Sequence, residues 1–183
     1  MEGKEYDINK TKNDESLGSW LRRLVIYVII ALILRFFVFN ITLVDGKSMF
    51  PTLDDGDRLI TEKISLNWRE VKRGDILVIH APDKVNQNYI KRVVAVAGDR
   101  IELIDGKVYL NGEVLNEKYV IDNPTHPYRD ISSWDIEEGQ VFVMGDNRGA
   151  SNDSRSFGPI DVNQVMGVSI FRLFPFSKFG ILN

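Results

Sequence analysis

Hydrophobic and polar residues are arranged differently in the first 44 residues and in the remainder of the chain. Positions 1–18 are mostly polar, and every residue from Leu24 to Leu34 is then apolar. No polar residue interrupts this run at helical spacing, so the helix that it predicts has no polar face. We therefore expect a flexible polar tail over 1–18 and an apolar helix over 19–40.

A helix of this kind is typical of a membrane span. The range Trp20–Phe39 supplies the roughly 20 mainly apolar residues that cross a bilayer core. Arg22, Arg23 and Arg35 would lie near its two boundaries, where long cationic side chains reach the headgroups. A buried core helix is one alternative. A cleaved signal peptide is another, although residues 40–44 lack the small side chains of a cleavage site.

The basic residues predict the orientation of this span. Five of them precede Leu24, whereas the nearest basic residues after the span are Lys47 and Arg58. Under the positive-inside rule the N-terminal tail then lies in the cytoplasm. We expect a single-pass protein of the cell membrane, with 19–40 as a transmembrane signal-anchor in the lipid bilayer. Residues 41–183 would form one extracytoplasmic domain.

Beyond residue 44 the pattern changes to short runs of Val, Ile and Leu separated by turn residues, which indicates β-strands. Asp105-Gly106 and Asn111-Gly112 are two-residue hairpin signals, so a meander is expected from Arg100 to Leu115. The fold class that follows is all-β, mainly antiparallel, with one N-terminal transmembrane helix. The expected strands are Arg58–Lys63, Asp75–His80, Tyr89–Ala97, Arg100–Ile104, Lys107–Leu110, Gln140–Met144 and Val165–Phe171.

Composition narrows the possible chemistry. The 183 residues contain no cysteine, which excludes disulfides, cysteine-ligated zinc, iron–sulfur clusters and thiol nucleophiles. The two histidines, His80 and His126, are expected to be packing or loop residues, so we expect neither a metal site nor a cofactor. The net charge of −3 gives no reason to expect nucleic acid as a partner.

Two short segments carry residues that could still support catalysis. Ser48 lies just before Phe50-Pro51, and the proline keeps its neighbour out of a helix, so the serine lies in an extended segment or a turn. A plain turn residue is the simpler interpretation.

Lys91 and Arg92 would point to opposite faces of an apolar strand, so one of them is desolvated unless the strand is at an edge. A desolvated lysine has a lowered pKa and can act as a general base.

The third segment is a polar loop, 145–160, that follows the apolar strand expected at Gln140–Met144. It contains three serines, two asparagines, two aspartates and two arginines. A solvated loop is the simplest interpretation. Asp153 and Arg155 would share a face if this segment were extended, and an ion pair between them would stiffen the loop, as is typical of segments that support a site.

Together these three segments, in this order behind a signal-anchor, resemble the type I signal peptidases in their small, single-anchor, Gram-positive form. The matching motifs are Ser-Met-x-Pro-Thr-Leu at 48–53, Lys-Arg-Val-Val at 91–94 with Gly98-Asp99, and Gly-Asp-Asn-Arg-x-x-Ser-x-Asp-Ser-Arg-x-Phe-Gly at 145–158. The resemblance implies a partly closed β-barrel or sheet. It also implies a membrane-bound serine endopeptidase that removes N-terminal signal peptides from secreted precursors through an acyl-enzyme.

The resemblance assigns a role to each matching residue. Ser48 would be the nucleophile and Lys91 the general base. Ser151 would orient the lysine through a hydrogen bond, and Asp153 and Arg155 would form an ion pair beside the site. The partners would be signal-peptide-bearing precursors with small residues one and three positions before the cut. We expect the enzyme to be a monomer.

Two further positions concern the substrate pocket and the oxyanion. Met49 would shape the pocket floor, and the backbone N–H of Ser48 would donate to the oxyanion. In the best-known form a serine two residues before the nucleophile supplies a second donor, but Gly46 stands there in this chain, as it often does in the Gram-positive branch. Another donor is therefore expected. Ala97 replaces a frequent proline, which affects only a turn.

Three other interpretations stay open. A self-cleaving repressor-type protease shares the serine/lysine dyad and a similar fold, but such proteins are soluble and usually carry a DNA-binding domain. A membrane-anchored β module that binds peptides without cutting them would be expected to lack the serine or the lysine. An organellar inner-membrane relative is excluded only weakly. The aromatic C-terminal stretch, Phe171–Leu182, is expected to pack in the core, with contact to a bilayer surface as the alternative.

Overall fold

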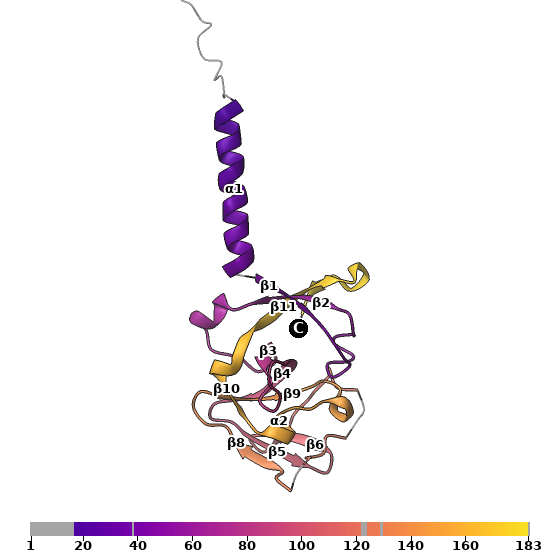
Figure 1. The fold of residues 1–183 in the computed structure, drawn as a ribbon. Helices are drawn as coiled ribbons and strands as arrows, with labels where there is room; N and C mark the ends of the chain where they lie inside the picture. Colours follow the sequence, from indigo (N-terminus) through magenta and orange to yellow (C-terminus); the bar gives the residue numbers. More distant parts are fainter. Residues whose placement is uncertain (1–16, 38, 122–123, 129, 183) are drawn as a thin grey trace, which may run out of the picture. The chain divides into compact units, whose positions relative to one another are not determined.

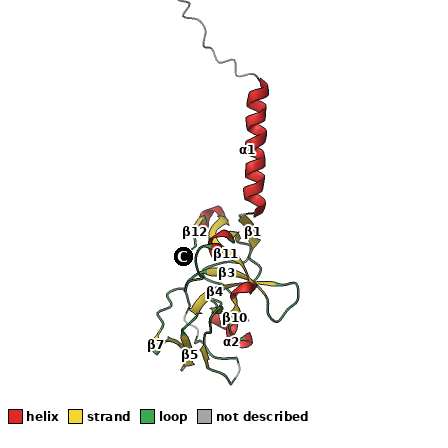
Figure 2. Cartoon of the chain, turned by 90° about the vertical axis from the view of Figure 1, so that its left-hand side faces the viewer, coloured by secondary structure: helices red, strands yellow, loops and turns green. Residues whose placement is uncertain are grey.

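The computed structural model describes residues 17–37, 39–121, 124–128 and 130–182. The chain divides into two compact units, Met1–Phe37 and Val38–Asn183. The first unit contains one helix, α1 (Leu17–Phe37). The second consists of strands and loops with a few short helical turns (Figures 1 and 2). Within the described ranges, no helix combines the length and the apolar character needed to cross a membrane.

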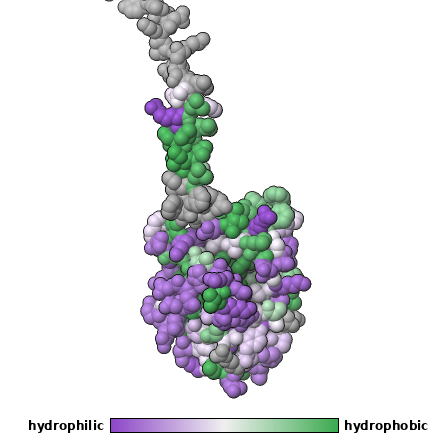
Figure 3. All heavy atoms as spheres, viewed as in Figure 1, coloured by the Kyte–Doolittle hydropathy of each residue, from purple (hydrophilic) through white to green (hydrophobic). Residues whose placement is uncertain are grey.

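The helix α1 confirms the helical prediction for the N-terminal run, with different bounds. The apolar side chains described along it, from Trp20 to Leu32, are exposed, and Figure 3 shows hydrophobic residues gathered along the helix. The expectation that the helix continues to residue 40 is wrong. Residues 39–43 form a strand instead, because their backbone pairs in antiparallel register with Arg58–Glu62.

Two antiparallel sheets make up the second unit, and the mainly antiparallel β prediction is confirmed. One contains β1 (Phe39–Leu43), β2 (Arg58–Glu62), β3 (Ile76–His80), β4 (Asn88–Val96), β9 (Gln140–Met144), β10 (Ile160–Asp161), β11 (Val165–Phe174) and β12 (Gly180–Ile181). The other contains β5 (Arg100–Ile104), β6 (Lys107–Leu110), β7 (Glu113–Val114) and β8 (Ser133–Asp135). The helical segments are α2 (Ser154–Phe157) and 3₁₀ turns at Ile64–Asn67, Arg148–Ala150, Val162–Gln164 and Phe176–Lys178.

Every expected strand is present, three of them with the expected bounds and the others with bounds shifted by at most three residues. The meander from Arg100 to Leu115 is confirmed, because β5, β6 and β7 pair in succession. Asp105 and Asn111 adopt positive φ at the two hairpin turns, as a type I′ turn requires. One strand that is absent from the expected set, β8, pairs with the edge of β5.

The larger sheet curves around a cavity. Its strand order is β1-β2-β11-β3-β4-β9-β10, so three strands separate β1 from β4. Residues of β1 and β4 nevertheless line the same cavity, which requires the sheet to bend between them. Figure 1 shows β1, β2 and β11 at one end of this unit and β5, β6 and β8 at the other. The cavity therefore lies in the part of the larger sheet remote from the small sheet.

Three hydrophobic clusters support this arrangement. One joins the two sheets and includes Phe142 and Met144 of β9. A second lies on the opposite side of the same strands and includes Val93 and Val143. The third lies beneath the turn that follows β1, and its buried members are Val44, Met49, Leu53, Leu59 and Ile76. This third cluster fixes the base of the turn in which Ser48 lies.

Candidate active site

Ser48 lies in the turn that follows β1, as the sequence predicts. The N–H of Val44 donates to the Asp57 carbonyl at 2.9 Å, which fixes the entry into the turn. The N–H of Gly46 donates to Asp55 Oδ1 at 2.9 Å, so this amide is already engaged. Gly46 has a φ of 99°, a conformation that favours glycine. The serine itself is half-buried, which leaves its hydroxyl accessible from the cavity.

Lys91 is placed on β4 between β3 and β9, in the interior of the larger sheet. Its Nζ donates to Ser48 Oγ at 3.0 Å and to the Ile90 carbonyl at 3.1 Å. Lys91 is 3% exposed and Arg92 is 2% exposed. The edge-strand alternative for these two cations is therefore wrong. The two side chains leave opposite faces of the strand, and each has its own set of partners.

Burial dominates the electrostatics of Lys91. Desolvation lowers the pKa of its amine from 10.5 to about 8, because the charged form loses its water. The charge of Asp153 opposes this change, and the charge of Arg155 reinforces it. The ring of Tyr89 also lies against the amine, with its centroid 5.1 Å from Nζ. The lowered pKa makes the neutral amine, which a general base requires, far more populated near physiological pH than it is in an exposed lysine.

The polar loop 145–160 is attached directly to the Ser48 turn. The N–H of Asn147 donates to the Ser48 carbonyl at 3.0 Å, and its side-chain Nδ2 donates to the Lys47 carbonyl at 3.1 Å. Residues a hundred positions apart thus hold each other in place. The simple interpretation of this loop as a solvated surface segment is wrong, since most of its charged side chains are buried.

The ion pair expected between Asp153 and Arg155 is present. Arg155 Nε lies 2.8 Å from Asp153 Oδ1, and a second guanidinium nitrogen lies 2.8 Å from Oδ2. Both side chains are buried. The extended geometry on which the pairing was predicted is wrong, because Asp153 caps the short helix α2 and accepts from the Arg155 backbone N–H. Asp153 Oδ2 also accepts from the N–H of Gly145, so the carboxylate links the first residue of the loop to the helix α2 within it.

Ser151 does not make the hydrogen bond to Lys91 that the resemblance implies. Its Oγ is buried and has no hydrogen-bond partner among the described residues. The hydroxyl packs against Gly145. A Cβ at position 145 would overlap Ser151 Oγ and the Ser48 carbonyl oxygen. Gly145 therefore permits the Ser48 turn and the polar loop to approach this closely, a role that the sequence analysis missed.

Two buried ion pairs between an arginine and a carboxylate are also not predicted from the sequence. Arg92 binds Asp146 through two hydrogen bonds of 2.9 Å and stacks on the ring of Tyr119, 4.2 Å away. Arg148 donates to Glu117 and to Thr125 Oγ1, the latter at 2.9 Å. Asp146 and Arg148 belong to the third motif, which could have drawn attention to them. Glu117 and Tyr119 lie in a segment with no recognisable signal.

Tyr128 is a further residue that holds the polar loop. Its single hydroxyl proton is shared between the Arg148 carbonyl at 3.1 Å and the Ser151 carbonyl at 3.0 Å. Its ring lies 4.5 Å from the guanidinium carbon of Arg155. The segment that precedes β8 thus also holds the polar loop in place.

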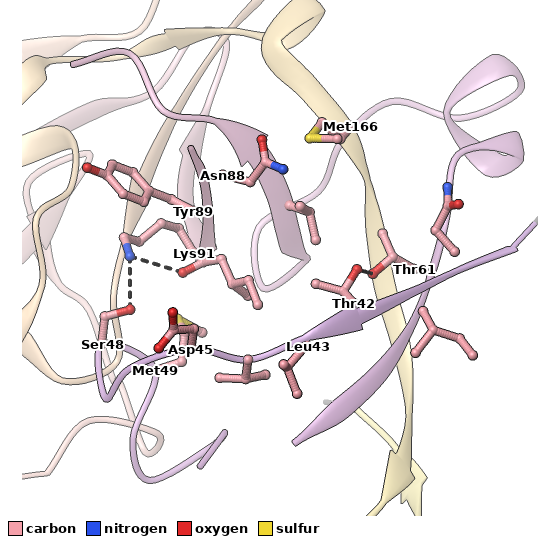
Figure 4. Close-up of a pocket in the computed structure, with 15 residues that line it drawn as sticks. Thr42, Leu43, Asp45, Ser48, Met49, Thr61, Asn88, Tyr89, Lys91 and Met166 are labelled. Atoms are coloured by element: carbon pink, nitrogen blue, oxygen red, sulfur yellow. Dashed lines mark hydrogen bonds between the residues drawn. The ribbon is translucent and has the colours of Figure 1, made fainter. Parts of the chain in front are cut away.

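A cavity of about 410 Å³ opens next to the Ser48–Lys91 pair. Figure 4 shows Ser48 and Lys91 at one end, with Met49 beside them, and Thr42 and Thr61 at the other. Met49 is almost fully buried and lines the cavity. The lining residues are Asn40 to Asp45, Ser48, Met49, Thr61, Val78, Asn88 to Lys91 and Met166.

Comparison with known proteins gives a consistent set of relatives. The profile of the family described as "Signal peptidase, peptidase S26" matches residues 17–174. The probable signal peptidase I-1 of Synechocystis sp. (strain ATCC 27184 / PCC 6803 / Kazusa) is 39% identical over 166 residues, or 87% of this chain and 83% of its own. The signal peptidase I of Bacillus licheniformis is 39% identical over 176 residues, or 92% of this chain and 94% of its own.

A crystal structure of a signal peptidase I from Enterococcus faecalis V583 was also found. It is 30% identical, covers 55% of this chain and 97% of that one, and superposes with a TM-score of 0.44.

Proposed function

The chain belongs to the signal peptidase family, peptidase S26, and from this premise we propose that it removes N-terminal signal peptides from precursor proteins with a serine/lysine dyad. The observation that supports this mechanism is the 3.0 Å separation of Lys91 Nζ and Ser48 Oγ at one end of a cavity. The lysine is desolvated by the surrounding sheet, so its neutral form is accessible. No histidine is needed for such a pair to act.

The reaction would proceed through an acyl-enzyme. Neutral Lys91 takes the proton of Ser48 Oγ as this oxygen attacks the scissile carbonyl carbon. The tetrahedral intermediate collapses, the C–N bond breaks, and protonated Lys91 gives its proton to the leaving amine. The signal peptide is then an ester on Ser48. Water attacks this ester with Lys91 again as the base, which releases the peptide carboxylate and restores both residues.

The neighbouring residues would hold this pair in place. The Ser48 backbone N–H is proposed as a donor to the oxyanion, and Gly46 allows the turn that presents it. The Asp153–Arg155 pair would fix the polar loop and adjust the charge state of Lys91. Ser151 is proposed to orient the lysine during turnover, since its buried hydroxyl lies against Gly145 without a partner among the described residues.

The substrate would bind as an extended strand in the cavity. In the described part of the chain β1 pairs only with β2, so its other edge can accept backbone hydrogen bonds from a peptide. Met49, Val44 and Ile90 form an apolar wall close to Ser48. Such a wall suits the small residue that the family prefers before the cut. The site uses residues of a single chain, so we expect a monomer to be active.

We also propose that the apolar N-terminal segment 19–40, which α1 covers only in part, anchors the enzyme in the cell membrane, with 41–183 on the extracytoplasmic side. Its described apolar side chains are exposed, although water solvates such a surface poorly. Arg22 and Arg23 precede the apolar run, as expected for a cytoplasmic N-terminus. The full chain should remain with membranes after an alkaline carbonate wash, and its release into the supernatant would contradict the anchor.

The direct test of the function is cleavage of a precursor by the purified full-length chain. A secretory precursor should be cut once, directly after its signal peptide, and N-terminal sequencing of the larger product identifies the bond. The Ser48→Ala variant, prepared in parallel, shows that the cut is not due to a contaminating protease. Absence of cleavage with several precursors would contradict the proposal.

The pH dependence of kcat/KM should reflect Lys91. We expect the rate to rise with pH through a midpoint near that amine's pKa of about 8, because only the neutral amine accepts the serine proton. Below the midpoint the rate should fall about tenfold per pH unit. Initial rates with a peptide that carries a signal-peptide cleavage sequence provide the measurement. A profile that is flat from about pH 6 to about pH 9 would exclude this role for Lys91.

Gly145→Ala should lower kcat by about tenfold or more. The new methyl group would overlap the Ser48 carbonyl oxygen and Ser151 Oγ, so the Ser48 turn and the polar loop must separate. Even a small displacement of a nucleophile lowers kcat by a factor of this order. Gly180→Ala is the matched control, because a Cβ there meets nothing within 4 Å. Equal kcat values for both variants would show that the close approach does not position the nucleophile.

A further inference from the structure

The two ends of the cavity differ in chemistry. Beside Ser48 the apolar side chains of Val44 and Met49 line the cavity together with those of the reacting pair, Asp45 and Tyr89. At the remote end the lining contains Thr42 and Thr61, two residues that carry hydroxyl groups. Figure 4 shows the Thr42 and Thr61 hydroxyls joined there, well separated from the Ser48–Lys91 pair. A cavity built only for alkyl side chains would not need these groups.

The hydroxyl of Thr42 belongs to a chain of three. Thr42 Oγ1 lies 2.8 Å from Thr61 Oγ1, which lies 3.0 Å from Ser169 Oγ. These residues come from the adjacent strands β1, β2 and β11 and share one face of the sheet, since Ser169 is directly opposite Thr61. Thr61 and Ser169 are buried, whereas Thr42 is half-buried on the edge strand. Thr42 is thus the member of the chain through which a ligand would reach it.

This chain retains unused hydrogen-bonding capacity. Three hydroxyls provide three protons, and the two bonds within the chain use only two of them. Depending on the direction of the bonds, Thr42 has either a proton to donate or two lone pairs to offer. Water can form this hydrogen bond with the Thr42 hydroxyl when no substrate side chain lies beside it. An alkyl side chain that displaces this water leaves the group unpaired, whereas a hydroxyl can donate or accept and replaces the water.

The spacing along β1 indicates which substrate residue reaches Thr42. Asn40 and Thr42 of β1, and Val44 just after it, occupy alternate positions and line the cavity, each about 6.7 Å from the next if the extended spacing continues to Val44. An extended substrate has the same repeat. If the residue before the cut lies beside Val44, next to Ser48, the side chain two residues further upstream lies beside Thr42.

We propose that Thr42, supported by Thr61 and Ser169, forms a hydrogen-bonding subsite for the side chain three positions before the cut. The subsite favours a hydroxyl-bearing side chain, serine or threonine, over an alkyl side chain of equal size. This specificity rests on the proposed function, because it needs a substrate that is cut at Ser48. It assigns to β1 a part in substrate choice in addition to backbone pairing.

The test compares two peptides that differ only in isosteric side chains. Full-length enzyme receives a mixture of precursor peptides with threonine or valine three positions before the cut, and the product ratio gives the ratio of their kcat/KM values. The wild-type enzyme should cleave the threonine peptide about three- to tenfold faster. Thr42→Val should bring the ratio close to one, and Thr42→Ser should preserve the preference. The ratio does not depend on the folded fraction of any variant.

The outcomes distinguish a failure of the subsite proposal from a failure of the proposed function. Equal cleavage of both peptides by the wild-type enzyme, or an unchanged ratio in Thr42→Val, overturns the subsite. If Thr42→Val has no activity, Thr42→Ala gives the ratio instead. A third peptide with alanine at the same position reports on the function itself. If the wild-type enzyme leaves the alanine peptide uncut as well, the proposed function fails before specificity is at issue.

Discussion

Replacing Ser48 with alanine or Lys91 with methionine should each lower kcat for precursor cleavage by about 10³-fold or more. Ser48→Ala removes the attacking oxygen. Lys91→Met keeps an unbranched apolar stem of similar length but removes the base that lies 3.0 Å from that oxygen. Because the two groups act on the same proton, the double variant should be no less active than either single one. Single-turnover cleavage of a precursor peptide is the suitable measurement.

The same lysine substitution should stabilise the fold at neutral pH. The unfolded chain binds the Lys91 proton up to a pKa of 10.5, but the folded chain binds it only up to about 8. Between these two pKa values the unfolded state holds more protons than the folded state, so the free energy of unfolding rises with pH. Below about pH 8 both states hold the proton, and the full cost of burying the charged amine lowers the stability of the fold. A shift of this size corresponds to about 3 kcal/mol. Lys91→Met should therefore increase the free energy of unfolding in urea by up to that amount below pH 8.

Two controls sharpen this prediction. Lys91→Arg keeps a cation that cannot lose its proton, so it should be as inactive as Lys91→Met without the gain in stability. Lys107→Met removes an exposed lysine of β6 and should change neither quantity. Wild-type cleavage by Lys91→Arg would exclude the neutral amine as the base. A loss of stability in Lys91→Met would show that the buried amine does not carry the desolvation penalty.

Breaking the buried Asp153–Arg155 pair should give the largest change in stability. Both side chains are almost fully buried, and each neutralises the other. Removing one partner leaves a buried charge without compensation, which costs about 3–5 kcal/mol. Asp153→Asn and Arg155→Met should therefore each lower the free energy of unfolding by about that amount. Arg100–Asp135, an exposed ion pair of β5 and β8, is the control, and Asp135→Asn should have no measurable effect.

These two substitutions should shift the pH–rate profile in opposite directions. Asp153 raises the pKa of Lys91 through its negative charge, and Arg155 lowers that pKa through its positive charge. Asp153→Asn should thus move the rising limb of kcat/KM to lower pH, whereas Arg155→Met should move it to higher pH. General destabilisation of the loop would not produce opposite signs. Shifts in the same direction would contradict an electrostatic role of the pair at Lys91.

Much of the fold is determined by local pattern. Alternation of Val, Ile and Leu with turn residues located seven strands, and Asp-Gly and Asn-Gly placed the two hairpins of the meander. These features depend on neighbours along the chain, so periodicity and turn chemistry report them directly. The helix is predicted to end at residue 40, but α1 ends at Phe37 and β1 begins at Phe39. Apolar residues that end a helix and those that begin an edge strand look alike until β2 provides a pairing partner.

The candidate residues were also recognisable from the sequence, but their environment was not. Ser48 and Lys91 stand out in their motifs, yet the burial of Lys91 depends on the position of β4 between β3 and β9. The predicted hydrogen bond from Ser151 to Lys91 is missing for a similar reason, since the position of its hydroxyl depends on how Gly145 packs. A motif reports which side chains are available, not the distances between them.

The sequence by itself determined the class of fold, the apolar N-terminal run and the candidate nucleophile and base. Only the tertiary structure decided which charges are buried together, as in the pairing of Arg148 with Glu117, and that a hydroxyl chain crosses three strands at the remote end of the cavity. The physical reason is that strand order and sheet curvature bring together residues more than a hundred positions apart, such as Thr61 and Ser169. Interactions between such residues leave no local periodicity in the sequence from which they could be predicted.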